Sequence, residues 1–364
     1  MKIVYLIHSL HNPGGMERVV SVKASWLAEH GCDVRILTAS LRSRKPFFPL
    51  SDKVSVMDLG TGDSFGPALR RYGKALERAL EDICPDICIS SGGNEIYALA
   101  ESRCSCAKIA EYHFSRDKFH LKYAFPFFGR IVADWRLGRL TAAAAKMDRF
   151  VVLTKADRRD WKRSLSNVEQ IYNPLTINVK ELSKLENECF VAVGRLSAEK
   201  NWPAMIEIWA KVLVRHPEWK LDIYGDGKLR DSLQKRIDAM GLQGKVTLCG
   251  ADPDIAARMA QASGLLLTSE REGFGLVLIE AAACALPLVS SACPVGPLEL
   301  IEDGVSGFLL PCGDTDAFVE AVCRLIEDRE LRLRMGRNAL EMSRKFSIDN
   351  VMGRWLELFR SLPD

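Results

Sequence analysis

The chain has 364 residues, of which 48% are apolar and 27% are charged, and its formal net charge is +3. This balance excludes a disordered chain, and the length exceeds what one compact core usually takes, so we expect two domains. The opening apolar run reaches His8 too soon for a secretory signal peptide, and no apolar run is long enough to span a membrane. We therefore expect a cytoplasmic protein.

The charge is divided unevenly between the two halves. Residues 1–170 contain 27 Lys and Arg against 19 Asp and Glu, a balance of +8, whereas residues 171–364 contain 23 against 28, a balance of −5. The basic half predicts an anionic partner, such as a membrane surface or a phosphorylated acceptor, although undirected drift of surface charge is an alternative. Nucleic acid is a poor candidate, because the sequence contains no recognition-helix or RNA-binding motif.

The 11 cysteines do not form a metal pattern. Cys84/Cys88 and Cys104/Cys106 are the only close pairs, and no second half-site completes a zinc motif. Cysteines in apolar segments predict buried free thiols in a reducing compartment. The examples are Cys189, Cys249, Cys284 and Cys323.

In chain order, short apolar runs alternate with amphipathic ones. The first half predicts a strand at 3–10, a helix at 16–31, and strands at 33–40, 86–90, 107–113 and 149–154. The second half repeats the scheme, with strands expected at 189–196, 220–227, 245–250 and 264–269 and helices at 201–217, 229–241 and 254–262. Strands that are apolar throughout, with helices between them, are typical of parallel sheets covered on both faces.

The alternation breaks at Asn173-Pro174 and the charged run that follows. We therefore predict one domain over 1–172, closed by a helix in 348–364, and a second over 173–347. The fold class is α/β, with two Rossmann-like domains whose parallel sheets face each other across a cleft. Ligands of such sheets bind beyond the carboxyl ends of the strands, so the motifs in those loops carry the function.

The first such loop contains Gly14-Gly15 in the stretch HNPGGMER, just before a helix. Backbone amides at a bare helix N-terminus can bind a phosphate, but a plain tight turn explains two glycines equally well. The loop lacks the G-x-G-x-x-G pattern, and the next strand ends in Thr-Ala-Ser rather than in an acidic residue. Both features disfavour a dinucleotide-dependent dehydrogenase.

Two loops of the second half carry charges next to expected strand ends. In VGRLSAEKN, Arg195 and Lys200 could neutralise a diphosphate without a metal, or could be a solvated basic loop. In EREGFGLVLIEAAACALP, Gly273 and Gly275 leave a helix N-terminus bare, Glu272 precedes the helix and Glu280 lies within it. A carboxylate among apolar residues needs partners, which ribose hydroxyls or a neighbouring loop could provide.

The two glutamates, with seven residues between them, resemble the motif of the retaining glycosyltransferases of family 4, which have the GT-B fold. The resemblance covers essentially the whole chain, because several further segments occur in the family's order. These are NPGGMER, VGRLSAEKN, IYGDGKLR and CPVGPLELIEDGVSGFLLPCGD.

The resemblance implies a role for each matching residue. Arg195 and Lys200 would hold the donor diphosphate, together with Gly14, Gly15 and the amides around Gly273, Phe274, Gly275 and Leu276. Glu280 would bind the nucleotide ribose, and Glu272 the transferred sugar. His113, at the end of an expected strand, matches a histidine near the donor sugar, although a strand-end histidine bonded to backbone is the simpler alternative.

The implied activity is transfer of a hexose or N-acetylhexosamine from a nucleotide sugar with retention of anomeric configuration. The acceptor would be a glycan or a polyprenyl-linked glycan, as in polysaccharide, lipopolysaccharide or glycoconjugate biosynthesis. By resemblance of CPVGP to related segments, the donor would be UDP-linked, with GDP-mannose still open. No metal or other cofactor is expected, and the DPD segment at 252–254 fits a helix start better than a metal site.

Segments 41–50 and 118–139 mix Arg and Lys with aromatic residues, which predicts peripheral binding at an anionic membrane surface. Ordinary helix packing with solvated cations is the alternative. Two rival functions are a nucleotide-sugar 2-epimerase of similar architecture and a non-catalytic donor-binding subunit. The spacing of the two glutamates disfavours the first, and the presence of all the candidate site residues disfavours the second.

Overall fold

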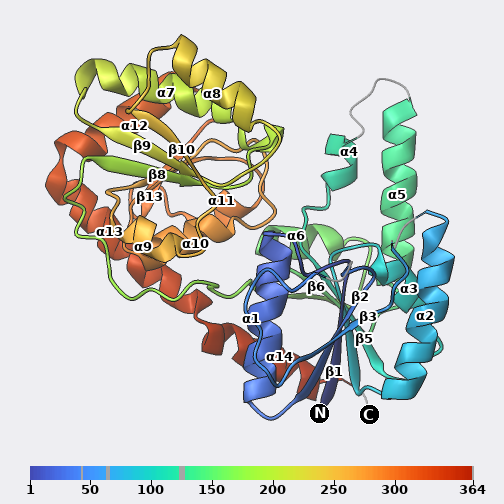
Figure 1. Ribbon diagram of the computed structural model, residues 1–364. Helices are drawn as coiled ribbons and strands as arrows, with labels where there is room; N and C mark the ends of the chain where they lie inside the picture. Colours follow the sequence, from blue (N-terminus) through green and yellow to red (C-terminus); the bar gives the residue numbers. More distant parts are fainter. Residues whose placement is uncertain (42–43, 63–65, 123–127, 363–364) are drawn as a thin grey trace. The chain divides into compact units, whose positions relative to one another are not determined.

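The computed structural model describes residues 1–41, 44–62, 66–122 and 128–362, shown in Figure 1. The chain forms two compact units: unit 1 comprises residues 1–176 and 348–364, and unit 2 comprises 177–347. Among the described residues, no helix is long and apolar enough to cross a membrane.

Unit 1 is built on a parallel sheet of seven strands in the order β3-β2-β1-β4-β5-β6-β7. Strands with few polar residues form its centre, because helices cover both faces. The strand bounds are β1 Lys2–Ile7, β2 Asp33–Thr38, β3 Ser55–Asp58, β4 Ile87–Ser91, β5 Ala107–Tyr112, β6 Arg149–Val152 and β7 Val168–Gln170. The order reverses between β1 and β4, so the loops after these two strands flank a topological switch point.

The helices of unit 1 form two layers. One layer packs α1 (Gly15–Glu29) and α14 (Ile348–Arg360) against one face of the sheet, and the two helices lie side by side in Figure 1. The other layer contains α2 (Ala68–Ile83), α3 (Glu95–Glu101), part of α5 (Phe128–Ala144) and α6 (Lys155–Trp161). The short α4 (Lys118–Lys122) packs on α5.

Unit 2 has a parallel sheet of six strands in the order β10-β9-β8-β11-β12-β13. The bounds are β8 Cys189–Val193, β9 Lys220–Tyr224, β10 Val246–Gly250, β11 Leu265–Leu267, β12 Leu288–Ser291 and β13 Gly307–Leu310. Its switch point lies between β8 and β11, the strands that precede the two charged loops predicted from the sequence. The switch point therefore brings those loops to the same edge of the sheet.

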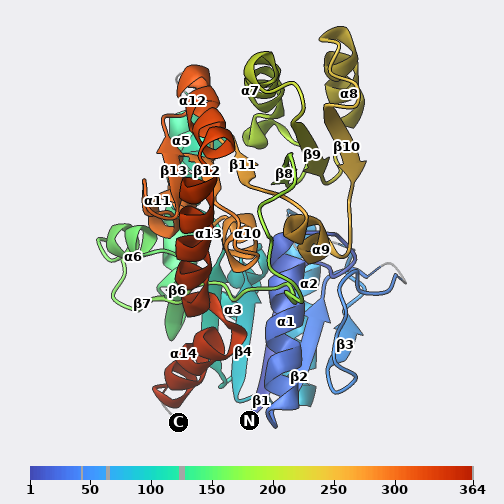
Figure 2. The same ribbon diagram turned by 90° about the vertical axis from the view of Figure 1, so that its left-hand side faces the viewer.

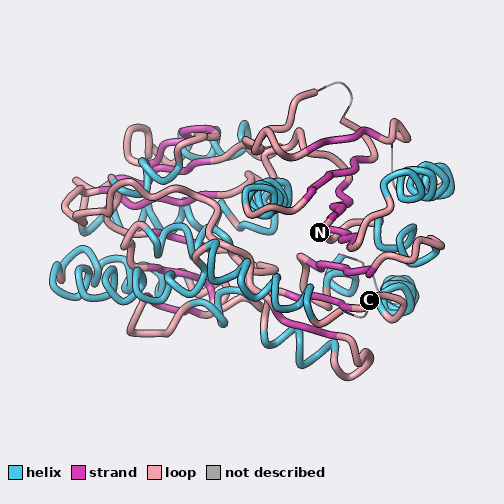
Figure 3. Tube along the Cα trace, turned by 90° about the horizontal axis from the view of Figure 1, so that it is seen from below, coloured by secondary structure: helices cyan, strands magenta, loops and turns pink. Residues whose placement is uncertain are grey.

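One face of this sheet is covered by α7 (Trp202–Arg215), α8 (Arg230–Ala239) and α12 (Thr315–Glu327), and Figure 2 shows α7 close to β8 and α8 close to β10. The remaining helices are α9 (Ile255–Ala260), α10 (Leu276–Ala283), α11 (Gly296–Leu300) and α13 (Arg329–Ser343), with 3₁₀ turns η1 (Ala198–Lys200) and η2 (Arg344–Phe346). In both units the strands run among surrounding helices (Figure 3).

The prediction of buried thiols is wrong for Cys249, which is exposed, and Cys189 is only half-buried. Cys249 lies on β10, the edge strand of the sheet, where alternate residues are exposed. Cys284 and Cys323 are buried as expected, and all 11 cysteines are free.

Candidate active site

In unit 2 the loops after β8 and β11 are joined by an ion pair between two of the predicted site residues. Lys200 Nζ lies 2.5 Å from Glu272 Oε1, and only 16% and 10% of their side chains are exposed. Ser269 Oγ donates to the same carboxylate oxygen at 2.7 Å. The pair places a cation and a hydrogen-bond acceptor together at the switch point, where a phosphate and a sugar hydroxyl could be bound side by side.

Hydrogen bonds to backbone atoms hold these two loops in register. Thr268 Oγ1 donates to the carbonyls of Lys200 and Asn201, and the Glu270 amide donates to the Glu199 carbonyl at 2.9 Å. Trp202 Nε1 donates to the Arg195 carbonyl at 2.9 Å, so the loop that carries Arg195 is fixed to the start of α7. The Arg195 side chain itself is exposed and is therefore accessible to a ligand from solvent.

The loop after β9 supports the Arg195 loop through two glycines. A Cβ on Gly225 would lie 1.9 Å from the Gly194 carbonyl oxygen, and a Cβ on Gly227 would lie 2.5 Å from that of Leu196. Both glycines also have positive φ, at 138° and 159°. The G-x-G in IYGDGKLR is therefore required for close backbone packing beneath the candidate anion site.

Helix α10 begins at Leu276, directly after the two-glycine loop. Gly275 is its N-cap residue at φ 88°, so the chain enters the helix in a left-handed conformation that favours glycine. The first amides of such a helix have no partner within the helix and can bind an anion. Glu280 is only 1% exposed and lies in the second turn, as the sequence predicts.

The loop that contains Gly273 and Phe274 packs against Phe346 and against the CPVGP segment. Phe274 is 4% exposed, and its ring packs edge-on against Phe346 with the centroids 5.8 Å apart. A Cβ on Gly296, within the CPVGP segment, would lie 2.0 Å from the Phe274 carbonyl oxygen. This glycine therefore allows the CPVGP segment to contact the two-glycine loop directly, a role that the sequence motif alone does not reveal.

In unit 1 the start of α1 and the strand end at His113 lie against the same loop, the one after β4, which flanks the switch point. Gly14 is the N-cap residue of α1, and Gly15 is the first residue of that helix. The contact between the two regions is at Gly92, after β4: a Cβ there would lie 3.0 Å from Met16 Sδ and 3.1 Å from His113 Cδ2. Gly92, which has φ 66°, is not among the residues predicted from the sequence, although the pair Gly92-Gly93 after an apolar strand could have indicated it.

His113 is 8% exposed and adjoins a buried ion pair that no sequence motif indicates. Its Nε2 lies 3.6 Å from Glu111 Oε1, and both oxygens of Glu111 accept from Lys23 Nζ at 2.7 Å. Burial alone would raise the pKa of Glu111, but Lys23 and His113 outweigh burial and lower that pKa to about 2. Burial lowers the pKa of Lys23, and Glu111 offsets part of this effect.

The DPD segment starts a helix, as the sequence predicts. Asp254 is the N-cap residue of α9 and accepts from the Ala257 amide at 3.3 Å, while Asp252 pairs with Arg258 at 2.8 Å. Within the described ranges of the chain, no group of three or more His, Cys, Asp or Glu side chains is arranged to hold a metal ion.

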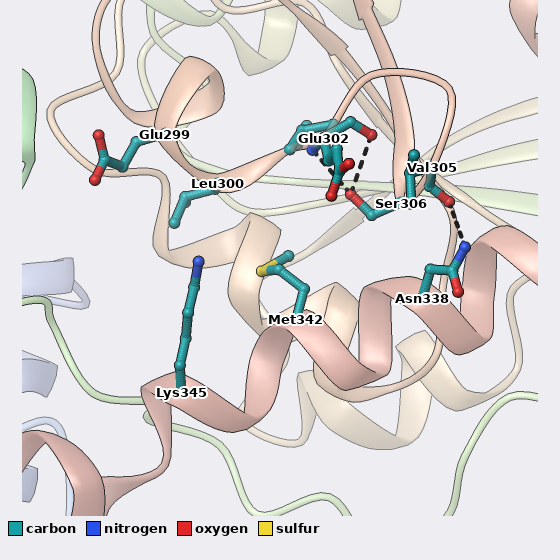
Figure 4. A pocket seen from close by; sticks show the side chains of 9 residues that line it. Glu299, Leu300, Glu302, Val305, Ser306, Asn338, Met342 and Lys345 are labelled. Atoms are coloured by element: carbon teal, nitrogen blue, oxygen red, sulfur yellow. Dashed lines mark hydrogen bonds between the residues drawn. The ribbon is translucent and has the colours of Figure 1, made fainter.

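A pocket of about 310 Å³ lies elsewhere in unit 2, between the segment around residues 299–306 and α13 (Figure 4). Its lining includes Glu302, Ser306, Asn338 and Lys345. The Glu302 amide donates to Ser306 Oγ at 3.1 Å, and Asn338 Nδ2 donates to the Val305 carbonyl at 3.0 Å. None of the predicted site residues lines this pocket, but Leu300, which does, would lie 3.8 Å from a Cβ at Gly275.

Comparison with known proteins gives matches over most of the chain. Residues 13–178 match the family model described as Glycosyltransferase Family 4, and residues 176–342 match the model described as Glycosyl transferases group 1. An uncharacterized glycosyltransferase of Haemophilus influenzae is 28% identical over 364 residues, with 97% of this chain and 98% of that protein covered. An undecaprenol-linked-glycan alpha-1,4-N-acetyl-D-galactosaminyltransferase of Campylobacter jejuni is also 28% identical, with 100% and 99% covered.

Solved structures show the same architecture. A crystal structure of S. aureus TarM with fondaparinux, alpha-GlcNAc-glycerol and UDP matches with a TM-score of 0.83 at 16% identity, covering 99% of this chain and 100% of that one. Anabaena HepE in complex with UDP and glucose matches with a TM-score of 0.77 at 21% identity, covering all of both chains. Together with the two family models, these similarities show that the chain belongs to glycosyltransferase family 4 and has the GT-B fold of two Rossmann-like units.

Proposed function

We propose that this glycosyltransferase moves a hexose or N-acetylhexosamine from a UDP-linked donor to a glycan or lipid-linked glycan, with retention of anomeric configuration. The observation that carries the proposal is the Lys200–Glu272 pair at the switch point of unit 2, beside the bare N-terminus of α10. The UDP complexes of TarM and HepE support the choice of nucleotide, and the undecaprenol-linked acceptor of the Campylobacter relative supports the acceptor class.

Each site residue has a distinct part in this proposal. Arg195 and Lys200 bind the donor diphosphate, helped by the first amides of α10, and Glu280 binds the ribose hydroxyls. When Lys200 pairs with a donor phosphate instead of Glu272, Glu272 Oε1 still accepts from Ser269. Glu272 Oε2 can then accept a hydrogen bond from the transferred sugar. For unit 1, the family resemblance assigns Gly15 to the phosphate and His113 to the sugar.

The proposed chemistry needs no protein nucleophile. The acceptor hydroxyl attacks the anomeric carbon on the face from which the nucleoside diphosphate departs, and the hydroxyl proton passes to the departing phosphate oxygen. Negative charge grows on that oxygen as its bond to the sugar breaks. Arg195, Lys200 and the α10 amides bind this charge more tightly in the transition state than in the ground state, without a metal ion.

A thermal-shift panel without added metal tests donor binding. UDP and UDP-sugars at about 100 times their Kd should stabilise the protein by about 2.7 kcal/mol, whereas GDP and ADP compounds should not. A parallel titration with EDTA should leave the shift unchanged. Stabilisation by GDP-sugars instead would contradict the UDP assignment, and a shift that disappears with EDTA would contradict the metal-free site.

Product analysis separates transfer from the rival functions. A transferase releases UDP in proportion to acceptor and joins the sugar to it with the donor's anomeric configuration. Release of free sugar products without any acceptor would identify an epimerase-like activity. Donor binding without turnover across an acceptor panel of lipid-linked and free glycans would instead favour a donor-binding subunit.

The structure also displays an exposed apolar stripe on α5, on the basic unit 1. The stripe recurs at the spacing i, i+3, i+4, i+7 and lies nearly opposite the buried face formed by Ala133 and Leu140. Its members, the α5 outer stripe, are Phe128 (78% exposed), Ile131 (65%), Val132 (37%) and Trp135 (57%). Residues 42–43 and 123–127 of the two segments predicted to bind a membrane lie outside the described residues.

We infer that the α5 outer stripe rests on an anionic lipid surface. Arg130, Arg136 and Arg139 outnumber the single carboxylate of Asp134 on this helix, and the guanidinium of Arg139 lies 5.0 Å from the centroid of the Trp135 ring. Exposed aromatic rings beside arginines suit a bilayer surface, where rings enter the headgroup layer and cations bind lipid phosphates.

Vesicle sedimentation tests this surface. The wild-type protein should sediment with phosphatidylglycerol-containing vesicles at low salt but not with phosphatidylcholine alone. Ile131 and Trp135 would each bury apolar surface in the lipid. The double substitution I131S/W135S removes that contribution and should reduce binding by about tenfold or more. Val214→Ser, which changes an 84% exposed residue on α7, should have no effect. Equal binding by the stripe variant and the wild type would refute the assignment.

A further inference from the structure

Lys23, Glu111 and His113 form a group in which a buried salt bridge adjoins the candidate sugar-binding histidine. Lys23 lies on α1 and is completely buried, and Glu111 lies on β5 with 2% of its side chain exposed. Taking two charges out of water costs several kcal/mol, and apolar residues of similar size often stabilise a core at least as well. The stability of unit 1 therefore does not by itself explain why Lys23 and Glu111 are charged residues.

A third element, helix α14, also contacts the salt bridge. Lys23 Nζ lies 3.7 Å from the ring centroid of Trp355, a completely buried residue of α14. Trp26 Nε1, one turn further along α1, donates to Asp349 of α14 at 2.8 Å, so the two helices are fixed to each other. Lys23 is thus immobilised by a cation–π contact on one side and a two-oxygen salt bridge on the other.

Glu111 and His113 are two residues apart at the end of β5, so their side chains point to the same side of the chain. The Nε2 of His113 is 3.6 Å from Glu111 Oε1, and Gly92 leaves room for the ring edge at Cδ2. Because Lys23 keeps the pKa of Glu111 low, the carboxylate is ionised near neutral pH and can only accept hydrogen bonds. The buried Nε2 of His113 has no hydrogen-bond partner among the described residues, and the nearby carboxylate can only accept, so it favours the ring tautomer whose proton is on Nε2.

We propose that Glu111, clamped by Lys23 and Trp355, is a positioning residue that fixes the tautomer and the ring orientation of His113 for contact with the donor sugar. This inference rests on the transferase function proposed above. It assigns the buried salt bridge to the alignment of one imidazole rather than to the stability of unit 1.

The decisive variant is Glu111→Gln. The glutamine carbonyl can still accept from Lys23, but its amide N–H presents a donor to His113, which favours the opposite tautomer with the proton on Nδ1. Nitrogen-15 NMR of the histidine side chains, without substrate, should show that change at His113. Because a misplaced contact group costs up to about 100-fold, kcat for transfer should fall by about 10- to 100-fold, while the Kd for UDP stays within about twofold.

Two control variants and a check of folding keep the result interpretable. Glu169→Gln, on β7 of the same unit, removes the charge of a half-buried residue paired with Arg158 and should change neither tautomer nor kcat. Circular dichroism verifies that each variant folds. The double variant K23M/E111Q removes both charges from the core; its stability should return towards that of the wild type, yet kcat should remain low.

The outcomes separate this inference from the proposed function. An unchanged His113 tautomer and a normal kcat in Glu111→Gln would overturn the positioning role, as would recovery of kcat in the double variant, because recovery would mean that the pair acts only through stability. If the wild type transfers no sugar at all, the proposed function fails. The NMR result then still reports whether Glu111 controls the imidazole.

Discussion

Lys200→Ala is expected to lower kcat/KM for sugar transfer by about 100- to 1,000-fold, the range seen when one preorganised charge-stabilising group is lost. Lys200 is the cation that meets Glu272 at the switch point of unit 2, with 16% of its side chain exposed. Its loss removes a counter-charge for the departing diphosphate, and it also leaves Glu272 without its cation. Steady-state kinetics with a UDP-sugar and an acceptor measure the effect, which should be larger in kcat than in KM.

Lys211→Ala is the matched control. Lys211 is on α7 of the same unit and pairs with Asp316 at 2.6 Å, but 52% of its side chain is exposed. An exposed pair contributes little, so stability and kcat/KM should be nearly unchanged. A similar small effect in both lysine variants would show that the switch-point cation does not stabilise the transition state, and the diphosphate role would have to be withdrawn from Lys200.

Gly225→Ala is expected to weaken UDP binding by at least about tenfold and to destabilise unit 2 by about 1–3 kcal/mol. The new methyl group would lie 1.9 Å from the Gly194 carbonyl oxygen, which is backbone and cannot rotate away. The loop that carries Arg195 would have to move, and the anion site would move with it. Calorimetry with UDP and urea unfolding measure the two effects.

The comparison with Gly244→Ala isolates the cause. Gly244 has φ 73°, so alanine is strained there too, but no atom lies within 4 Å of the added Cβ. That variant should lose about 1 kcal/mol of stability from backbone strain and should bind UDP normally. Wild-type UDP binding by Gly225→Ala would show that the glycine loop after β9 does not position the Arg195 loop.

The sequence predicts the architecture well where strands are buried on both faces. The run 3–10 covers β1 apart from Lys2, and the runs 149–154 and 189–196 contain β6 and β8, because inner strands of parallel sheets are mostly apolar. It fails for β3, whose residues Ser55–Asp58 are mostly exposed at the sheet edge and have no apolar run. The short strands β7, β12 and β13 are not predicted either. Although β12 is fully buried, its four residues LVSS end in two serines and form too short an apolar run.

The candidate donor site could be inferred because its residues are close in sequence to recognisable loops. The ion pair between Lys200 and Glu272 could not, because the two residues are 72 positions apart and only the strand order brings their loops together. The buried salt bridge of Lys23 is even harder to predict from the sequence. A lysine in a helix is usually expected to face solvent, and nothing local indicates the carboxylate of Glu111, 88 positions away.

Helix α14 follows unit 2 in the chain but packs in unit 1, which affects the order in which the two units can fold during synthesis. The core of unit 1 includes residues on both sides of unit 2 in the chain, so on the ribosome it is incomplete until the residues after 347 have emerged. Until then Lys23 lacks the ring of Trp355. Unit 2, a continuous segment, can complete its contacts first, which reverses the usual order in which the N-terminal domain of a nascent protein folds earliest.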